Sequence, residues 1–237
     1  MRFVLVALVL FGATLIRSVF GFGDALFAMP LMSFVVGVGT AAPVMGLVSL
    51  VVAVGILLTS WRHVDMTAVW RLIVASLIGI PVGVLMLKGI DEQVLRIGLG
   101  VTVAGFGLYR LTWPRLPELR SSSWAFLFGF VGGCLGGAYN VGGPPLVVYG
   151  AIRRWDPQRF RGTLQGTFLG TSVIIAAAHG LAGLWTENVW RLFLVSIPAV
   201  VLAMLLGRKM AGRMEPAAFD RYLSLALVVL GVMLLVG

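Results

Sequence analysis

The sequence predicts an all-α, polytopic helical membrane protein, and three observations support this fold class. Of the 237 residues, 59% are hydrophobic and only 11% are charged, whereas a soluble domain carries about 25% charged residues. Long runs, such as residues 25–61 and 121–152, contain no charged side chain, and a bilayer core requires about 20 apolar residues per helix. The seven tryptophans lie at or near the ends of the apolar runs, as expected for side chains at a membrane–water interface.

Each half of the chain is predicted to contain an apolar helix, a Gly/Pro break, a short apolar segment and three further helices. In the first half, the helical segments are 3–20, 31–38, 43–60, 68–87 and 94–111. In the second half, they are 124–139, 146–152, 163–180, 189–207 and 219–236. The segments after Pro30 and Pro145 are too short to cross a bilayer alone. Each is therefore expected to form, with the helix before it, a hairpin that turns back inside the membrane.

The two halves are similar enough in sequence to indicate a duplication. Residues 21–30 align with residues 136–145, and the four residues at 69–72 recur identically at 189–192. We therefore predict one transmembrane domain over 1–237, with repeat one at about 1–112, a linker at 113–120 and repeat two at about 121–237.

The basic residues predict how the helices cross the membrane. The formal net charge is +9, with 18 Lys and Arg against 9 Asp and Glu. Cytoplasmic loops are enriched in Lys and Arg, so the arginines at 110–120 and 153–161 place both loops inside, and residues 121–152 must form a hairpin. Thirteen basic residues then lie inside and four outside, with Arg17 left within the first helix. This distribution argues against a nucleic-acid partner and predicts an inverted-topology repeat, as in many secondary transporters.

The two Gly/Pro breaks are the predicted substrate site. Irregular backbone at membrane depth must be buried in protein or line a wet cavity. A helix N-terminus presents free N–H groups and a positive dipole end, and glycines allow close approach of a ligand, so the two breaks together predict an anion site. The alternative is that these glycines only serve packing and kinking. The candidate substrate-binding residues are Gly21, Gly23, Asp24, Pro30, Asn140, Gly142, Gly143, Pro144, Pro145 and Arg17.

Two charged side chains lie deep in the apolar sequence. Arg17 and Asp24 form either a structural ion pair that closes the first hairpin, or a functional pair in which Arg17 attracts an anion and Asp24 tunes it or carries a proton. Asn140 is a candidate hydrogen-bond donor to an oxyanion. His179 is expected near the outer face as a capping residue. Interhelical hydrogen bonds are favoured for the remaining polar residues of that helix, which are Gln165, Thr167, Thr171 and Ser172.

At the two breaks the sequence resembles the sulfite exporter TauE/SafE family. The resemblance is carried by residues 21–30, by residues 136–149, and by the continuation from Trp155 to Gly162. It implies passage of sulfur-containing oxyanions, such as sulfite, sulfoacetate and related organosulfonates, across the inner membrane.

The predicted function is a secondary carrier for small anions in the cell inner membrane, in which one repeat rocks against the other. An anion channel and a carrier of non-sulfur carboxylates are the alternatives. An enzyme is not expected, because the sequence lacks the His-Glu-x-x-His and Gly-x-Ser-x-Gly motifs and a pair of acids at membrane depth. No cofactor or metal is predicted. The expected partners are the substrate anion and membrane lipid, with protons as a candidate coupling ion and a homo-oligomer left open.

Overall fold

A computed structural model describes residues 2–60, 65–112, 117–119, 121–210 and 216–236, and all regular structure in these ranges is helical. This confirms the all-α prediction; residues 113–116 and 120 of the predicted linker lie outside the described ranges. The described helices are α1 (Arg2–Phe20), α2 (Asp24–Val36), α3 (Val38–Ser60), α4 (Met66–Gly89), α5 (Glu92–Thr112), α6 (Trp124–Tyr139), α7 (Gly143–Ile152), α8 (Pro157–Leu181), α9 (Glu187–Met210) and α10 (Pro216–Val236).

Six of the described helices, α1, α3, α4, α5, α8 and α9, are long and apolar enough to cross a membrane. Their outward faces carry large apolar side chains that are more than half exposed, among them Leu8, Ile78 and Leu85. Soluble proteins rarely expose so much contiguous apolar surface to water, whereas the lipid-facing surface of a membrane protein is apolar. The chain is therefore a multi-pass membrane protein.

The first hairpin begins its second helix earlier than expected. Gly21 and Gly23 have positive φ values of 88° and 99° and end α1, because glycine adopts this backbone conformation without steric cost. Helix α2 then starts at Asp24, so Pro30 lies inside it and not at its start. The expected helix start at residue 31 is wrong, and the expected boundary between the short segment and the next helix moves to Gly37.

The second hairpin follows the predicted pattern more closely. Helix α6 ends at Tyr139, with Asn140 in the left-handed conformation, and α7 begins at Gly143. Pro144 and Pro145 occupy the first turn of α7, where a missing N–H group removes no intrahelical hydrogen bond.

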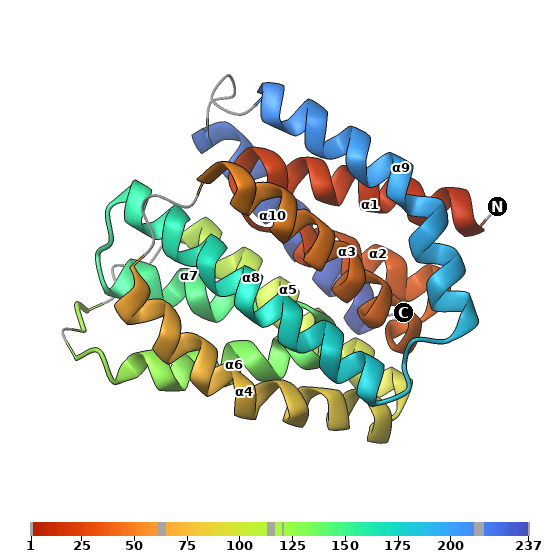
Figure 1. The fold of residues 1–237 in the computed structure, drawn as a ribbon, viewed down its shortest axis with the longest axis horizontal. Coiled ribbons are helices and arrows are strands. Elements are labelled where there is room, and N and C mark those ends of the chain that lie inside the picture. The colour runs from red at the N-terminus through yellow and green to blue at the C-terminus, as the bar shows by residue number, and fades with distance from the viewer. Residues whose placement is uncertain (1, 61–64, 113–116, 120, 211–215, 237) are drawn as a thin grey trace.

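The loops gather at two ends of the molecule (Figure 1). At the end that we call the arginine-rich end, the backbone N–H of Leu119 donates to the carbonyl of Ile152, and Arg159 pairs with Asp65. At the opposite end, Lys88 donates to the carbonyl of Ala182. The α6–α7 hairpin enters from the arginine-rich end and the α1–α2 hairpin from the opposite end, where both termini also lie (Figure 1).

Glycines bring the two halves into backbone contact. A Cβ atom on Gly79 or Gly83 of α4 would overlap the backbone of α6, and one on Gly129 or Gly133 of α6 would overlap α4. Gly79 with Gly83, and Gly129 with Gly133, have the Gly-x-x-x-Gly spacing that lets helices approach closely.

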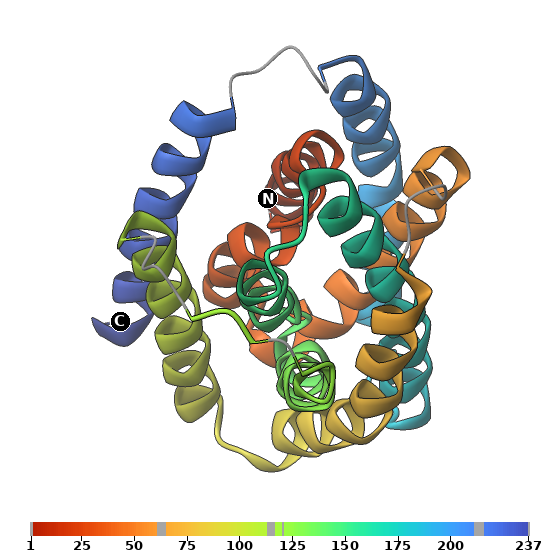
Figure 2. The same ribbon diagram turned by 90° about the vertical axis from the view of Figure 1, so that its left-hand side faces the viewer.

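When each helix is replaced by its counterpart in the other half, the pattern of helix contacts stays the same. Helix α4 packs on α6 as α1 packs on α9, while α5 packs on α10 and α3 on α8. Figure 2 shows α2 and α7 toward the middle of the molecule, with α4, α5, α9 and α10 around them. This pairing is what an inverted repeat would produce, although the orientation of the halves in a bilayer stays a prediction.

Candidate functional site

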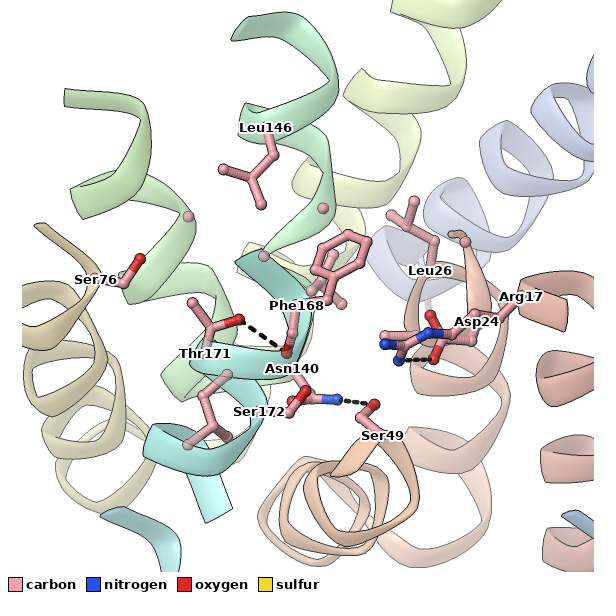
Figure 3. Close-up of a pocket in the computed structure, with 17 residues that line it drawn as sticks. Arg17, Asp24, Leu26, Ser49, Ser76, Asn140, Leu146, Phe168, Thr171 and Ser172 are labelled. Atoms are coloured by element: carbon pink, nitrogen blue, oxygen red, sulfur yellow. Dashed lines mark hydrogen bonds and ion pairs between the residues drawn. The ribbon is translucent and has the colours of Figure 1, made fainter. Parts of the chain in front are cut away.

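The two helix breaks meet at one buried cavity, which we call the central cavity (Figure 3). Its volume is about 40 Å³, above the roughly 10–15 Å³ that a single water molecule needs. Its walls come from both hairpins and from α3, α4 and α8. Its polar lining residues are Arg17, Asp24, Ser49, Ser76, Asn140, Thr171 and Ser172.

The structure brings six of the ten predicted site residues to this cavity, and these are Arg17, Gly23, Asp24, Asn140, Gly142 and Gly143. Pro144 and Pro145 are buried in the first turn of α7 and are not among the lining residues. Pro30 is buried within α2, where its carbonyl accepts a hydrogen bond from Ser33, because α2 starts a full turn and more before it. Gly21 lines a neighbouring cavity.

Arg17 and Asp24 form a buried ion pair across the first break. The distance from Arg17 Nη1 to Asp24 Oδ2 is 2.9 Å, and the two residues are only 3% and 8% exposed. The guanidinium group also lies over the ring of Phe168, 5.3 Å from its centroid. Nevertheless, Nε and Nη2 of Arg17 are buried without a hydrogen-bond partner. Because buried charged donors are costly when unpaired, this cavity wall favours an anionic ligand.

The start of α7 adds neutral donors to the cavity. The first backbone N–H groups of a helix have no intrahelical acceptor, and in α7 two of those positions are prolines, which have no N–H. The remaining N–H groups belong to Gly142 and Gly143, and both glycines line the cavity. The prolines thus confine the free donors, and the positive end of the helix dipole, to the cavity-lining glycine pair.

Asn140 is held by α3. Its side-chain nitrogen Nδ2 donates to Ser49 Oγ at 2.7 Å and to the Met45 carbonyl at 3.3 Å (Figure 3). Both amide N–H groups are therefore already used, which makes Asn140 a positioning residue in this structure. The hydroxyl of Ser49, oriented by accepting this bond, is the group that α3 presents to the cavity.

Helix α8 contributes polar residues, only some of which make the interactions expected from the sequence. The hydroxyls of Thr167 and Thr171 bond back to carbonyls of α8 itself, so the expected interhelical bonds are absent for these two. Gln165 does bond across, from Nε2 to the carbonyl of Gly21. Thr171 and Ser172 line the cavity.

His179 is not an interfacial cap. It is fully buried, and its Nε2 lies 2.8 Å from the carbonyl of Gly137 in α6. Helix α8 packs mainly on α3 and α4, and no local sequence pattern identified those neighbours. Ser49, Ser76 and Phe168 are lining residues that sequence reasoning missed; the two serines were visible only as isolated hydroxyls within charge-free runs.

The cavity suits binding of an anion better than chemistry on it. Its one carboxylate is paired with Arg17, and among the described residues no group of three or more His, Cys, Asp or Glu side chains could hold a metal ion. Two broken hairpins that meet at a polar cavity in a bundle of apolar helices are typical of membrane transporters. Fold and site together thus define a helical membrane transporter.

Comparison with known proteins identifies the family. The sulfite exporter TauE/SafE family matches residues 5–234. The chain is 30% identical over 182 residues to a probable sulfite/organosulfonate exporter TauE of Cupriavidus necator, covering 73% of this chain and 70% of that protein. No solved structure gives a significant match. The chain belongs to the sulfite exporter TauE/SafE family, a family of membrane transporters and not of enzymes.

Proposed function

We propose that this protein is a secondary carrier of sulfur oxyanions, sulfite or small organosulfonates, in the cell inner membrane. The single observation that carries the proposal is the set of unsatisfied donors at the central cavity, the Nε and Nη2 groups of Arg17. A sulfite or sulfonate group has three oxygen atoms that accept hydrogen bonds, so it can engage the guanidinium group and the α7 N–H groups together. The family and the name of the Cupriavidus necator relative support the sulfur anion.

Alternating access fits the way the helices pair. The most extensive contacts join helices of different halves, α4 with α6, α5 with α10 and α1 with α9. A rigid half could not move without breaking these glycine-rich contacts, so we infer that each moving body combines helices from both halves. This refines the expectation that one repeat rocks against the other.

The proposed orientation places the arginine-rich end in the cytoplasm. The described basic residues at that end include Arg110 in the last turn of α5 and, around the junction of α7 and α8, Arg153, Arg154 and Arg159, in agreement with the positive-inside rule. The orientation is tested with an impermeant thiol reagent on a Cys134→Ala protein that carries either Arg154→Cys or Glu187→Cys. Labelling of Arg154→Cys from inside-out vesicles and of Glu187→Cys from right-side-out vesicles is expected. The reverse result would overturn the proposed topology.

Transport itself is tested by counterflow in proteoliposomes. Labelled sulfite, sulfoacetate, thiosulfate and acetate are offered to vesicles preloaded with each unlabelled anion. We expect saturable uptake of sulfite or sulfoacetate that is accelerated by the same anion inside. Uptake without saturation or counterflow would indicate a channel, and a preference for acetate would indicate a carboxylate carrier. The matched control is Arg17→Lys, which keeps a positive charge beside Asp24 but lacks the Nε and Nη2 donors, and it should lose most of the uptake.

A further inference from the structure

A second cavity lies between the central cavity and the arginine-rich end, and we call it the vestibule. Its volume is about 140 Å³. Two basic side chains line it, Arg110 from the last turn of α5 and Arg161 from the first turns of α8. Arg110 lies over the ring of Phe22, and Phe22 belongs to the break between α1 and α2. The vestibule is therefore built on the reverse side of the same break that forms the central cavity.

One face of α8 lines both cavities in succession. The vestibule is lined by Arg161, Leu164 and Gln165 of α8. The central cavity is lined by Phe168, Thr171, Ser172 and Ile175 of the same helix. The steps of three or four residues place all of these on one side of an α-helix. The first and last lie 14 residues apart, or about 21 Å at 1.5 Å per residue.

A polar contact lies where the residues that line the two cavities meet. Gln165 Nε2 donates to the carbonyl of Gly21 at 2.5 Å, joining α8 to the first break. Gln165 is 8% exposed and its Oε1 is buried without a partner, so one hydrogen bond holds the side chain. Gly21 lines the vestibule and Gly23, two residues on, lines the central cavity.

We propose that the transport path follows this face of α8, that the vestibule is a second anion site, and that Gln165 with Gly21 forms the barrier between the two sites. The anionic ligand of the vestibule rests on the proposed function, whereas the barrier is independent of that function. A sulfonate or sulfite in the vestibule meets Arg110 and Arg161. It reaches Arg17 when Gln165 releases the Gly21 carbonyl. A barrier held by one neutral hydrogen bond opens at small energetic cost.

The barrier is tested by the accessibility of the central cavity. The probe is Ser172→Cys in a Cys134→Ala background, since Cys134 is the one native cysteine. The purified protein in detergent is treated with a negatively charged sulfonate methanethiosulfonate or with its trimethylammonium counterpart, and the labelling rate is followed by mass spectrometry. We expect Gln165→Ala to raise the rate of both reagents by about fivefold or more, as loss of one hydrogen bond allows.

A matched control comes from the same turn of α8. Thr167 is fully buried, bonds only within α8 and lines neither cavity, so Thr167→Ala should leave the rate within about twofold. Gln165→Glu keeps the side-chain length but loses the donor, and it should raise the rate of the cationic reagent. Unchanged rates in both Gln165 variants would overturn the barrier.

The charge selectivity of the vestibule is measured in the same protein. Arg161→Gln should lower the ratio of anionic to cationic labelling rates by about threefold. Arg154→Gln is the control, because Arg154 pairs with Glu118 outside the vestibule. An unchanged ratio in Arg161→Gln would overturn the second anion site.

Protection by sulfoacetate separates this inference from the proposed function. Saturating sulfoacetate should slow the labelling of Ser172→Cys. Absence of protection, together with an intact effect of Gln165→Ala, would reject sulfoacetate as a ligand of the central cavity and leave the barrier supported. Protection by sulfoacetate without any effect of Gln165→Ala would reject the barrier and leave the substrate supported.

Discussion

Asp24 accepts a hydrogen bond from one nitrogen of Arg17, Nη1, while the other two guanidinium nitrogens are buried without a partner. A pair that served only to close the hairpin would satisfy more of the guanidinium group, because Arg can donate five hydrogen bonds in a planar fork. The ion pair and the anion site are therefore compatible. We propose that Asp24 pairs with Arg17 when no substrate is present, and that the two nitrogens without a partner bind the substrate.

Arg17→Lys separates these two roles. The ammonium group can still pair with Asp24, but it cannot present the Nε and Nη2 donors. We expect near-normal thermal stability and a loss of uptake by about tenfold or more, the value of one or two hydrogen bonds to a charged group. Initial rates of sulfite or sulfoacetate uptake in proteoliposomes, beside thermal unfolding in detergent, provide the measurement. Normal uptake in this variant would remove Arg17 from the site.

Asp24→Asn leaves the Arg17 charge buried and uncompensated. Breaking a buried ion pair from one side costs about 3–5 kcal/mol, so the variant should unfold at a lower temperature than wild type. A bound anion can replace the lost carboxylate, so sulfoacetate should raise the unfolding temperature of the variant more than that of wild type. Equal stabilisation of both proteins would contradict the shared site. Normal transport with a lost pH dependence would instead assign Asp24 a role in proton coupling.

Gly142 and Gly143 are adjacent but should respond differently to alanine. A Cβ on Gly143 would lie 3.6 Å from Phe168 Cζ, an ordinary contact, whereas a Cβ on Gly142 would lie 2.8 Å from the Gly132 carbonyl oxygen. Gly143→Ala should insert and fold normally but lose anion flux, because the methyl group narrows the cavity beside the free N–H groups. Gly142→Ala should lose stability by about 1–3 kcal/mol as α6 and α7 are forced apart. Flux with unchanged apparent affinity in Gly143→Ala would show that the proposed site is wrong.

Asn140 combines a left-handed backbone, with φ at 55°, and two bonds to α3. Asn140→Ala loses the two hydrogen bonds and also strains the left-handed backbone. Asn140→Gly loses only the hydrogen bonds, because glycine adopts this conformation without steric cost. We expect both variants to insert but to lose anion flux, and the glycine variant to be more stable by about 1 kcal/mol. Equal stability of the two, measured by thermal unfolding, would mean that the backbone conformation costs nothing there.

The pair of Asp65 and Arg159 should make stability depend on pH. Partial burial raises the pKa of Asp65, but the hydrogen bond and charge of Arg159 and the N–H groups of Ala68 and Thr67 outweigh it and hold the pKa below its ordinary value of 3.8. Stability from this group is therefore present above pH 3.8 and is lost as the pH falls through the lower folded-state pKa.

Asp65→Asn tests this pair, because Asn caps α4 as well as Asp does. It should destabilise the protein by about 1 kcal/mol at neutral pH, and the difference from wild type should shrink as the pH falls below 3.8. Thermal unfolding across a pH series measures it. Asp91→Asn is the control, because the Asp91 carboxylate accepts from the Gln93 N–H at the start of α5 and has no ion pair among the described contacts. A difference that grew on acidification would contradict the assignment.

The sequence predicted the helices better than it predicted their partners. Apolar runs and flanking charges placed α6 and α9 within a few residues of their observed ends, because burial in lipid depends on local composition. The start of α2 was missed, because Pro30 marked a helix start more visibly than Asp24 did. Asn140 was placed in the site, but its partner Ser49 lies 91 residues away in a run without charges, and no local pattern identifies such a contact.

The long separation between α1 and its partner affects how the protein is made. Helix α1 packs mainly on α2 and α9, and α9 begins only at Glu187, so the ribosome completes most of the chain before α1 has its distant neighbour. A lone charge in the bilayer core during that interval would be costly. Arg17 and Asp24 are seven residues apart and can pair as soon as the first hairpin forms. We therefore expect this pair to let the first hairpin remain in the membrane during synthesis, before the transport site exists.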